Sequence, residues 1–149
     1  MYDSLLNAIE NRMRSYAEQL QPPCSDAELH ALRHRARLEL GHDAPDEYVR
    51  FLKRANGIDW NGLVIYASER APIVGHADRS IDGFVDANLD FRDHSAFADY
   101  LVFADDGVAL FVYHVTRSVY QAITRVGLVD LESFRSFDDL IANALSGHI

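Results

Sequence analysis

Two histidines stand four residues apart in a segment with helical periodicity. His30 and His34 therefore share one face of the expected helix, and this is the spacing of a two-histidine metal pair. A complete site needs further ligands, and the positive charges of Arg33, Arg35 and Arg37 oppose the approach of a divalent cation. We interpret this helix face as a solvated surface rather than a metal site.

A second pattern, Asp86, Asn88 and Asp90, alternates oxygen ligands as the start of a calcium-binding loop does. The rest of such a loop does not follow. Phe91 stands in place of the glycine of the tight turn, and Phe97 stands in place of the bidentate glutamate at the twelfth position. These are the two most demanding positions of an EF-hand, so we predict no calcium site here.

Cys24 is the only cysteine of the chain, so it cannot form an internal disulfide. A thiolate nucleophile needs a base or a positive neighbour, but Cys24 follows two prolines and precedes a helix cap with no such signature around it. The sequence has no Gly-x-Ser-x-Gly elbow and no glycine-rich phosphate loop. We therefore assign no catalytic residue, and we expect neither a cofactor nor a metal.

Negative charge is the more informative feature. The chain carries 14 Lys and Arg against 23 Asp and Glu, a formal net charge of -9, which disfavours nucleic acid as a partner because like charges repel. Residues 78–106 hold eight Asp against two Arg, whereas residues 1–42 are almost neutral. Such a polarised surface would attract a basic partner. The alternative is that these aspartates form a solvated face or serve turns and caps.

Trp60 lies in the segment Asn-Gly-Ile-Asp-Trp-Asn-Gly, residues 56–62, which we interpret as a glycine-flanked turn. A tryptophan in a well-packed contact can dominate an interface. It can equally cover the end of the helical layer with its N–H bonded to backbone. We favour the packing role and still count Trp60 among the candidate contact residues.

Apolar residues recur every three or four positions in four segments, which predicts amphipathic helices. In the first helix this apolar stripe includes Tyr16 and Leu20. Ser25 and Glu28 have the spacing of a capping box at the start of the second, and Gly41 is suited to end it. The expected helices span residues 5–20, 25–41, 45–55 and 136–147.

From residue 63 onward the pattern approaches a period of two, and β-branched and aromatic residues become dense. An Asp-Gly turn at 105–107 separates two of the apolar runs, so we expect three successive strands in an antiparallel meander. Residues 68–99 show a weaker pattern, with short helical turns expected near 87–99. The expected strands span residues 63–67, 100–104, 108–115 and 119–126, and the segment 127–134 can add an edge strand.

The composition, with 48% hydrophobic and 25% charged residues over a length of 149, is typical of one folded domain. We predict a single α+β domain over residues 1–149, with N-terminal helices, a central antiparallel meander and a C-terminal helix packed on the sheet. Charges recur every few residues near the N-terminus. We therefore expect no signal peptide, no membrane span and a cytoplasmic location.

Short motifs follow one another in a recognisable order along residues 43–149. They are Pro45-Asp46-Glu47-Tyr48 with Phe51-Leu52, Ala55-Asn56-Gly57, Asn61-Gly62-Leu63 with Ile65-Tyr66, Tyr100-Leu101-Val102-Phe103 with Asp105 and Gly107, and Ser136-Phe137 with Leu140. In order and spacing they resemble the SUKH superfamily, in which bacterial toxin-immunity proteins are grouped with a fungal regulator of cell-wall assembly. Residues 1–42 would then be an N-terminal helical extension of this core.

The resemblance implies a non-enzymatic protein-binding domain, whose members frequently neutralise a cognate toxin such as a nuclease. A nuclease carries a basic surface for its substrate, and an acidic protein can occupy that surface. From charge and expected exposure we predict partner contacts at Asp59, Trp60, Asp86, Asp90, Asp105 and Asp106. Two alternatives stay open: a housekeeping interaction or scaffold domain without a toxin, and an enzyme or small-ligand binder that uses a pocket between helices and sheet.

Overall fold

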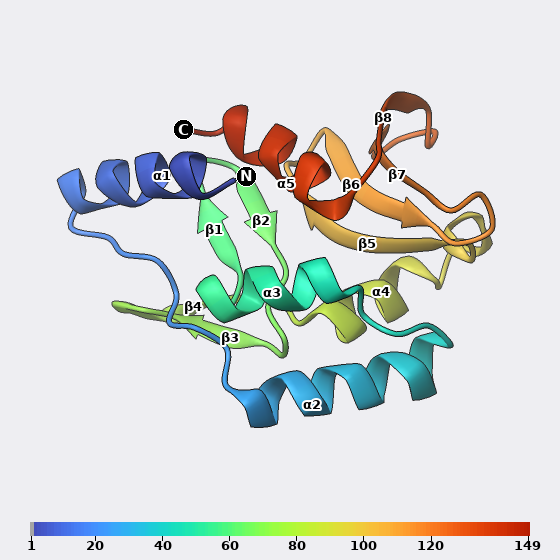
Figure 1. Cartoon of the computed structure of the whole chain (residues 1–149), viewed down its shortest axis with the longest axis horizontal. Helices are drawn as coiled ribbons and strands as arrows, with labels where there is room; N and C mark the ends of the chain where they lie inside the picture. The colour runs from blue at the N-terminus through green and yellow to red at the C-terminus, as the bar shows by residue number, and fades with distance from the viewer. Residues whose placement is uncertain (1) are drawn as a thin grey trace.

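The computed structural model describes residues 2–149 and contains, within them, a six-stranded antiparallel sheet (Figure 1). The strand order is β1-β2-β5-β6-β7-β8, so β5 joins an N-terminal hairpin to a C-terminal meander. The predicted meander and its edge strand are confirmed. The strands are β1 Ile58–Trp60, β2 Leu63–Ile65, β5 Tyr100–Asp105, β6 Ala109–His114, β7 Val119–Thr124 and β8 Asp130–Phe134.

Five α-helices surround this sheet within the described range: α1 Asp3–Ser15, α2 Asp26–Arg35, α3 Asp46–Arg54, α4 Phe84–Phe91 and α5 Phe137–Ser146. Helix α5 packs on β6, β7 and β8, and both α1 and α3 lie against α5. Helix α2 continues into a π-helical turn, Ala36–Leu40, that lies against α4, and α4 packs on β5. The α+β class and the packing of the C-terminal helix on the sheet are therefore as predicted.

The helix starts follow from local side-chain hydrogen bonds. Ser25 Oγ accepts from the Glu28 amide at 3.2 Å, and Glu28 Oε1 accepts from the Ser25 amide at 3.0 Å, which is the predicted capping box. Ser136 Oγ accepts from the Asp139 amide at 3.1 Å and begins α5 in the same way. Gly41, with a φ of 75°, ends the π-helical turn that follows α2.

Helix α1 ends at Ser15, earlier than the predicted residue 20. Ala17 adopts a left-handed φ of 56°, and the amides of Ala17 and Glu18 bond back to the carbonyls of Arg14 and Met13. This is a Schellman ending, usually built on glycine, so an alanine there carries no sequence signal. The prediction that Tyr16 continues the buried stripe is wrong, because its side chain is 66% exposed.

The sequence prediction missed the first strand and the hairpin that it forms. Strands β1 and β2 form an antiparallel hairpin, and Asn61 and Gly62 are the two residues of the turn that connects them. Their φ values of 49° and 87° are both positive, as a type I′ hairpin turn requires. Trp60 therefore lies at the end of β1 and not in a turn. The strands are only three residues long, too short to show a period of two.

Residues 68–99 contain more regular structure than predicted. Strands β3 Ala71–Ile73 and β4 His76–Ile81 form a separate two-stranded sheet. The helical turns expected near 87–99 are α4, which begins earlier at Phe84, and a 3-10 turn, Ser95–Phe97. Glycine at position 57 lets the chain pass from α3 into β1, because a Cβ there would lie 2.9 Å from the Ile65 carbonyl oxygen and its φ is 87°.

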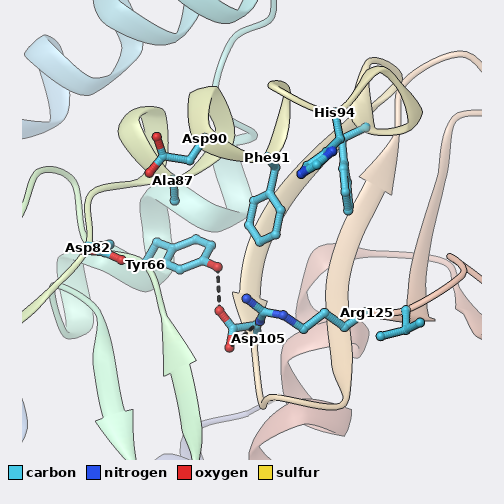
Figure 2. Close-up of a pocket in the computed structure, with 10 residues that line it drawn as sticks. Tyr66, Asp82, Ala87, Asp90, Phe91, His94, Asp105 and Arg125 are labelled. Atoms are coloured by element: carbon cyan, nitrogen blue, oxygen red, sulfur yellow. Dashed lines mark hydrogen bonds and ion pairs between the residues drawn. The ribbon is translucent and has the colours of Figure 1, made fainter.

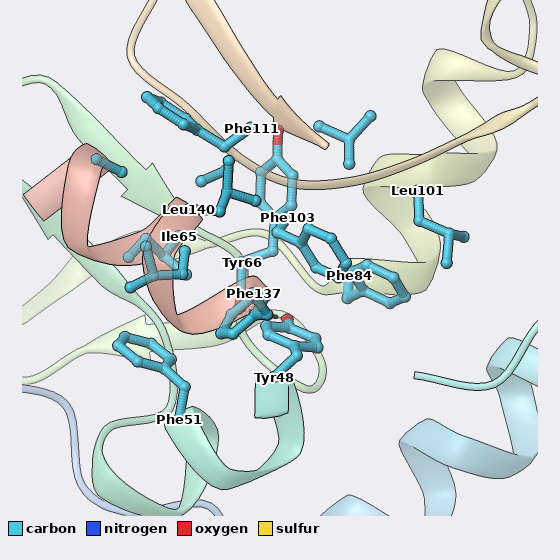
Figure 3. Packing of buried hydrophobic residues seen from close by; sticks show 14 of the residues in the cluster. Tyr48, Phe51, Ile65, Tyr66, Phe84, Leu101, Phe103, Phe111, Phe137 and Leu140 are labelled. Atoms are coloured by element: carbon cyan, nitrogen blue, oxygen red, sulfur yellow. Dashed lines mark hydrogen bonds between the residues drawn. The ribbon is translucent and has the colours of Figure 1, made fainter. Parts of the chain in front are cut away.

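An aromatic cluster joins the helices to the sheet (Figure 3). The Tyr48 ring of α3 lies 5.0 Å from Phe84 of α4, 5.2 Å from Phe103 of β5 and 5.5 Å from Phe137 of α5, measured between ring centroids. All four side chains are fully buried. The Tyr48 hydroxyl donates to the Tyr66 carbonyl at 2.7 Å, which satisfies the one polar atom of this cluster.

The side chain of Asn88 fastens α4 to the open edge of β5. Strand β2 pairs with β5 only at Ala104 and Asp105, and its chain leaves the sheet beyond Tyr66. At Val102 the side-chain amide of Asn88 takes the place of the missing strand β2. Its Oδ1 accepts from the Val102 N–H at 2.7 Å, and its Nδ2 donates to the Val102 carbonyl at 2.9 Å. Asn88 is 1% exposed, so water does not compete for these bonds.

We expect Asn88→Ala to lower the free energy of unfolding by about 3 kcal/mol, because both backbone groups of Val102 lose their partner inside the core. Urea unfolding followed by circular dichroism measures this loss. Asn143→Ala is the matched control, since Asn143 is exposed on α5 and, among residues 2–149, its side chain makes only a 3.4 Å bond to Glu132. Equal losses in the two variants would show that the Asn88 bonds do not hold α4 in place.

Candidate functional site

An open pocket of about 510 Å³ lies between α4, the end of β5 and the residues that follow β7 (Figure 2). Its polar lining consists of Tyr66, Asp82, Asp90, His94, Asp105 and Arg125, and its apolar lining of Ala87, Phe91, Phe97 and Val126. Three carboxylates therefore face one guanidinium above apolar walls. The pocket combines negative charge with an aromatic surface.

One side of the pocket is held by a chain of polar contacts. The Tyr66 hydroxyl donates to Asp105 Oδ2 at 2.7 Å, and Asp105 Oδ1 lies 3.3 Å from an Arg125 guanidinium nitrogen. The Arg125 guanidinium in turn lies over the Phe91 ring, 5.9 Å from its centroid. Figure 2 shows Tyr66, Asp105 and Arg125 from three different segments meeting at this wall.

Tyr66 connects this wall to the core. Its ring is buried, its backbone amide donates to the Phe103 carbonyl, and its own carbonyl accepts from Tyr48. Burial, and then the negative charge of Asp105, raise the pKa of Tyr66 far above its ordinary value. The phenol therefore stays protonated and keeps Asp105 as the acceptor.

The other side of the pocket carries two carboxylates without a partner. Asp82 precedes α4, and Asp90 lies in its last turn. Both side chains are exposed, and neither makes a hydrogen bond or ion pair with any residue in the range 2–149. Figure 2 places them on the same side of the pocket, above and beside Tyr66. Their charges are thus available to a bound molecule.

The structure brings together only two of the six predicted contact residues, Asp90 and Asp105. Asp86 lies one turn before Asp90 on the exposed side of α4, and its carboxylate is 3.0 Å from the Arg35 guanidinium. Asp59 lies on β1, with a carboxylate oxygen 3.3 Å from Arg79. These internal ion pairs reduce what Asp59 and Asp86 can offer to a partner.

Asp106 acts within the turn between β5 and β6. One of its oxygens accepts from the amides of Val108 and Ala109, and the other lies 3.1 Å from a ring nitrogen of His148. Although burial raises the pKa of Asp106, these hydrogen bonds outweigh it and hold that pKa below its ordinary value. These bonds within the turn account for an aspartate at position 106, and no contact with a partner protein is needed to explain it.

Trp60 lies away from the pocket. Its ring packs beside Tyr16, with 6.0 Å between centroids, and lines a different depression that includes Asn61 and Ile149. The expected bond from the indole N–H to backbone is wrong, because this nitrogen is buried and has no acceptor in the part of the chain that the structure describes. The placement of Trp60 against the helical layer agrees with the packing role.

The remaining sequence candidates are placed as follows. His30 and His34 are both exposed on α2, and within residues 2–149 no three His, Cys, Asp or Glu side chains lie close enough to hold a metal ion. Asn88 is turned into the core, away from the exposed Asp86 and Asp90. Cys24 is buried, and its burial raises the pKa of the thiol.

Sequence reasoning missed the residues that give the pocket its shape, namely Tyr66, Phe91, Phe97 and Arg125. They come from a segment after β2, from α4, from the 3-10 turn and from the turn after β7. No local pattern relates them. Val126, which the sequence pattern placed at the end of an expected strand, lies instead in the turn after β7 with its side chain 88% exposed, so no sequence signal marked it as part of a pocket.

No protein-family model matches this chain, and no curated protein gives a significant sequence match. None of the helices in the described range has the length and apolar character that a membrane crossing requires.

The pH dependence of the free energy of unfolding tests whether Tyr66 is buried and protonated in this wall of the pocket. Below pH 10 its phenol is protonated in both folded and unfolded chains, so it adds no pH dependence. Above pH 10 only the unfolded chain ionises it, and the free energy of unfolding falls by about 1.4 kcal/mol per pH unit on account of this group.

We expect Tyr66→Phe to be less stable than wild type at neutral pH by about 1 kcal/mol, because the bond to Asp105 is lost. Its stability should then fall less steeply than that of wild type between about pH 10 and about pH 11.5. Urea unfolding at a series of pH values measures both slopes. Identical slopes in the two proteins would contradict a buried, protonated Tyr66.

Proposed function

We propose that this chain is a non-enzymatic protein-binding domain that neutralises a cognate toxin by covering a basic surface of that toxin. The observation that carries the proposal is the pocket itself, in which unpaired carboxylates stand beside apolar walls. Electrostatic attraction would bring a cationic partner to this face, and burial of the apolar walls would hold it there.

The distribution of charge supports the same face. Asp82, Asp86 and Asp90 follow one another at four-residue intervals, and Asp86 and Asp90 share the exposed side of α4. Of these, only Asp86 pairs with a described residue, Arg35, and that arginine is already bonded to Glu39 at 2.6 Å. The face formed by α4 and the pocket therefore retains excess negative charge.

The resemblance to the SUKH superfamily supports the toxin as the partner and immunity as the role. A basic nuclease domain is the class of toxin that best complements this face, because its substrate site must attract phosphates. A housekeeping partner with a basic surface would use the same geometry, and the experiment distinguishes the two.

The direct test is co-expression of this chain with the product of the adjacent reading frame, where the proposal expects a toxin domain to be encoded. Neutralisation predicts that cells survive the toxin only when this chain is present, and that the two proteins purify together. Survival without a complex, or a chain that instead purifies with one abundant cellular assembly, would overturn the toxin role.

Association kinetics of the purified complex test the acidic face. We expect the association rate constant to fall about tenfold or more when the salt concentration rises from about 50 to about 500 mM, because salt screens the attraction. Asp90→Lys should slow association by about tenfold at low salt, whereas Asp78→Lys, the same charge change on β4, should change it less than about twofold. An association rate constant that changes neither with salt concentration nor in the Asp90→Lys variant would contradict binding through this acidic face.

A further inference from the structure

The pocket already holds one guanidinium, and its surroundings show what chemistry suits that group. The Arg125 guanidinium lies between the Asp105 carboxylate, at 3.3 Å, and the face of the Phe91 ring, at 5.9 Å from the centroid. A carboxylate and an aromatic face are the two surfaces that a planar guanidinium binds best. Arg125 itself is anchored through its backbone amide, which donates to the Val108 carbonyl at 2.9 Å.

The same pocket contains carboxylates that Arg125 does not neutralise. Arg125 can neutralise one of the three, and the nearest is Asp105. Asp82 and Asp90, on the opposite side, pair with none of residues 2–149. The volume of about 510 Å³ is within the range of pockets that take an organic group, and the pocket is open to solvent. A second cation therefore has both room and a counter-charge.

Val126 lines the pocket beside Arg125, and two further exposed valines stand at neighbouring strand ends. We call these three residues the valine rim. Val108, Val126 and Val129 are 74%, 88% and 59% exposed. Backbone bonds bring them together: the Val108 carbonyl accepts from Arg125 and the Val129 carbonyl from Thr124, and Val126 follows directly in the chain. Exposed valines gathered at three neighbouring strand ends are unusual on a surface that water covers.

We infer that this pocket receives an arginine side chain of a basic partner protein, with the guanidinium on the Asp82 and Asp90 side and the valine rim closing against apolar residues that flank the arginine. The inference rests on the proposed function and adds the chemistry of the anchor. A buried charged contact surrounded by apolar groups that exclude water is the arrangement of an interface hot spot. Arginine fits better than lysine because its planar group can lie on the aromatic wall while bonding a carboxylate.

The test is an NMR titration of the full chain, labelled with nitrogen-15, with the capped peptide acetyl-Val-Arg-Val-amide. We expect saturable shifts of backbone amides in residues 87–94 and 125–126, with a Kd of about 1 mM. The same peptide with citrulline in place of arginine, which keeps the shape and removes the charge, should bind about tenfold more weakly or not at all.

Two double variants distinguish binding at the pocket carboxylates from a general effect of the net charge of the protein. Asp82→Asn with Asp90→Asn should weaken the arginine peptide about tenfold, while Asp26→Asn with Asp78→Asn, an equal charge change elsewhere on the surface, should alter its Kd less than about twofold. Equal binding of the citrulline peptide, or equal effects of the two double variants, would overturn the inference. Free arginine binding as tightly as the peptide would assign the pocket to a small cation instead of a protein.

These outcomes are separate from those of the proposed function. If the toxin complex forms and neither Asp82 nor Asp90 matters to the peptide, the arginine anchor fails while toxin binding stands. If the peptide binds at the pocket but no toxin complex forms, the anchor stands for another basic partner and the neutralising role fails.

Discussion

The side-chain amide of Asn88 is the contact on which the arrangement of this protein depends. It replaces a missing strand at Val102, where β5 would otherwise present an unpaired N–H and carbonyl to the interior. Because an unpaired backbone group in a core is costly, the position of α4 relative to the sheet is strongly determined. A third bond, from Asn88 Nδ2 to the Phe84 carbonyl at 2.8 Å, stays within the helix and orients the amide.

The position of α4 decides the position of the pocket. On its buried side Phe84 stacks on Phe103, with ring centroids 5.6 Å apart, and this places the helix beside the end of β5. On its other side the same helix presents Asp90 and Phe91 to the pocket opposite Asp105. Core packing and surface charge are therefore coupled through one short helix, and a change that loosens α4 would also separate the carboxylates from the aromatic wall.

Much of the fold could be predicted from local patterns, because the signals lie within one segment. The capping residues Ser25 and Ser136 mark helix starts that the structure confirms, and the Asp-Gly turn after β5 marks the meander. The ending of α1 was missed because Ala17 holds a conformation that glycine usually signals. The hairpin at Asn61 and Gly62 was missed because strand β1 is only three residues long, which is too short for an alternation of period two to be recognised.

The site was less predictable for a physical reason. Charge alone selected Asp90 and Asp105, which the fold places in one pocket, but it also selected Asp59 and Asp106, which the fold uses in an ion pair and a turn. Whether an aspartate is free depends on which cation the tertiary structure brings to it, and that information is not local. Tyr66 and Arg125 became part of the site only because strands distant in sequence end side by side.

The most direct test is hydrogen-deuterium exchange of this chain alone and in the presence of the toxin domain proposed as its partner. The account predicts added protection in residues 84–94 and 124–130, where α4 and the turn after β7 frame the pocket, and little change in α2 or in the β3–β4 hairpin. Protection confined to α2 or to that hairpin, with the pocket segments unchanged, would contradict it.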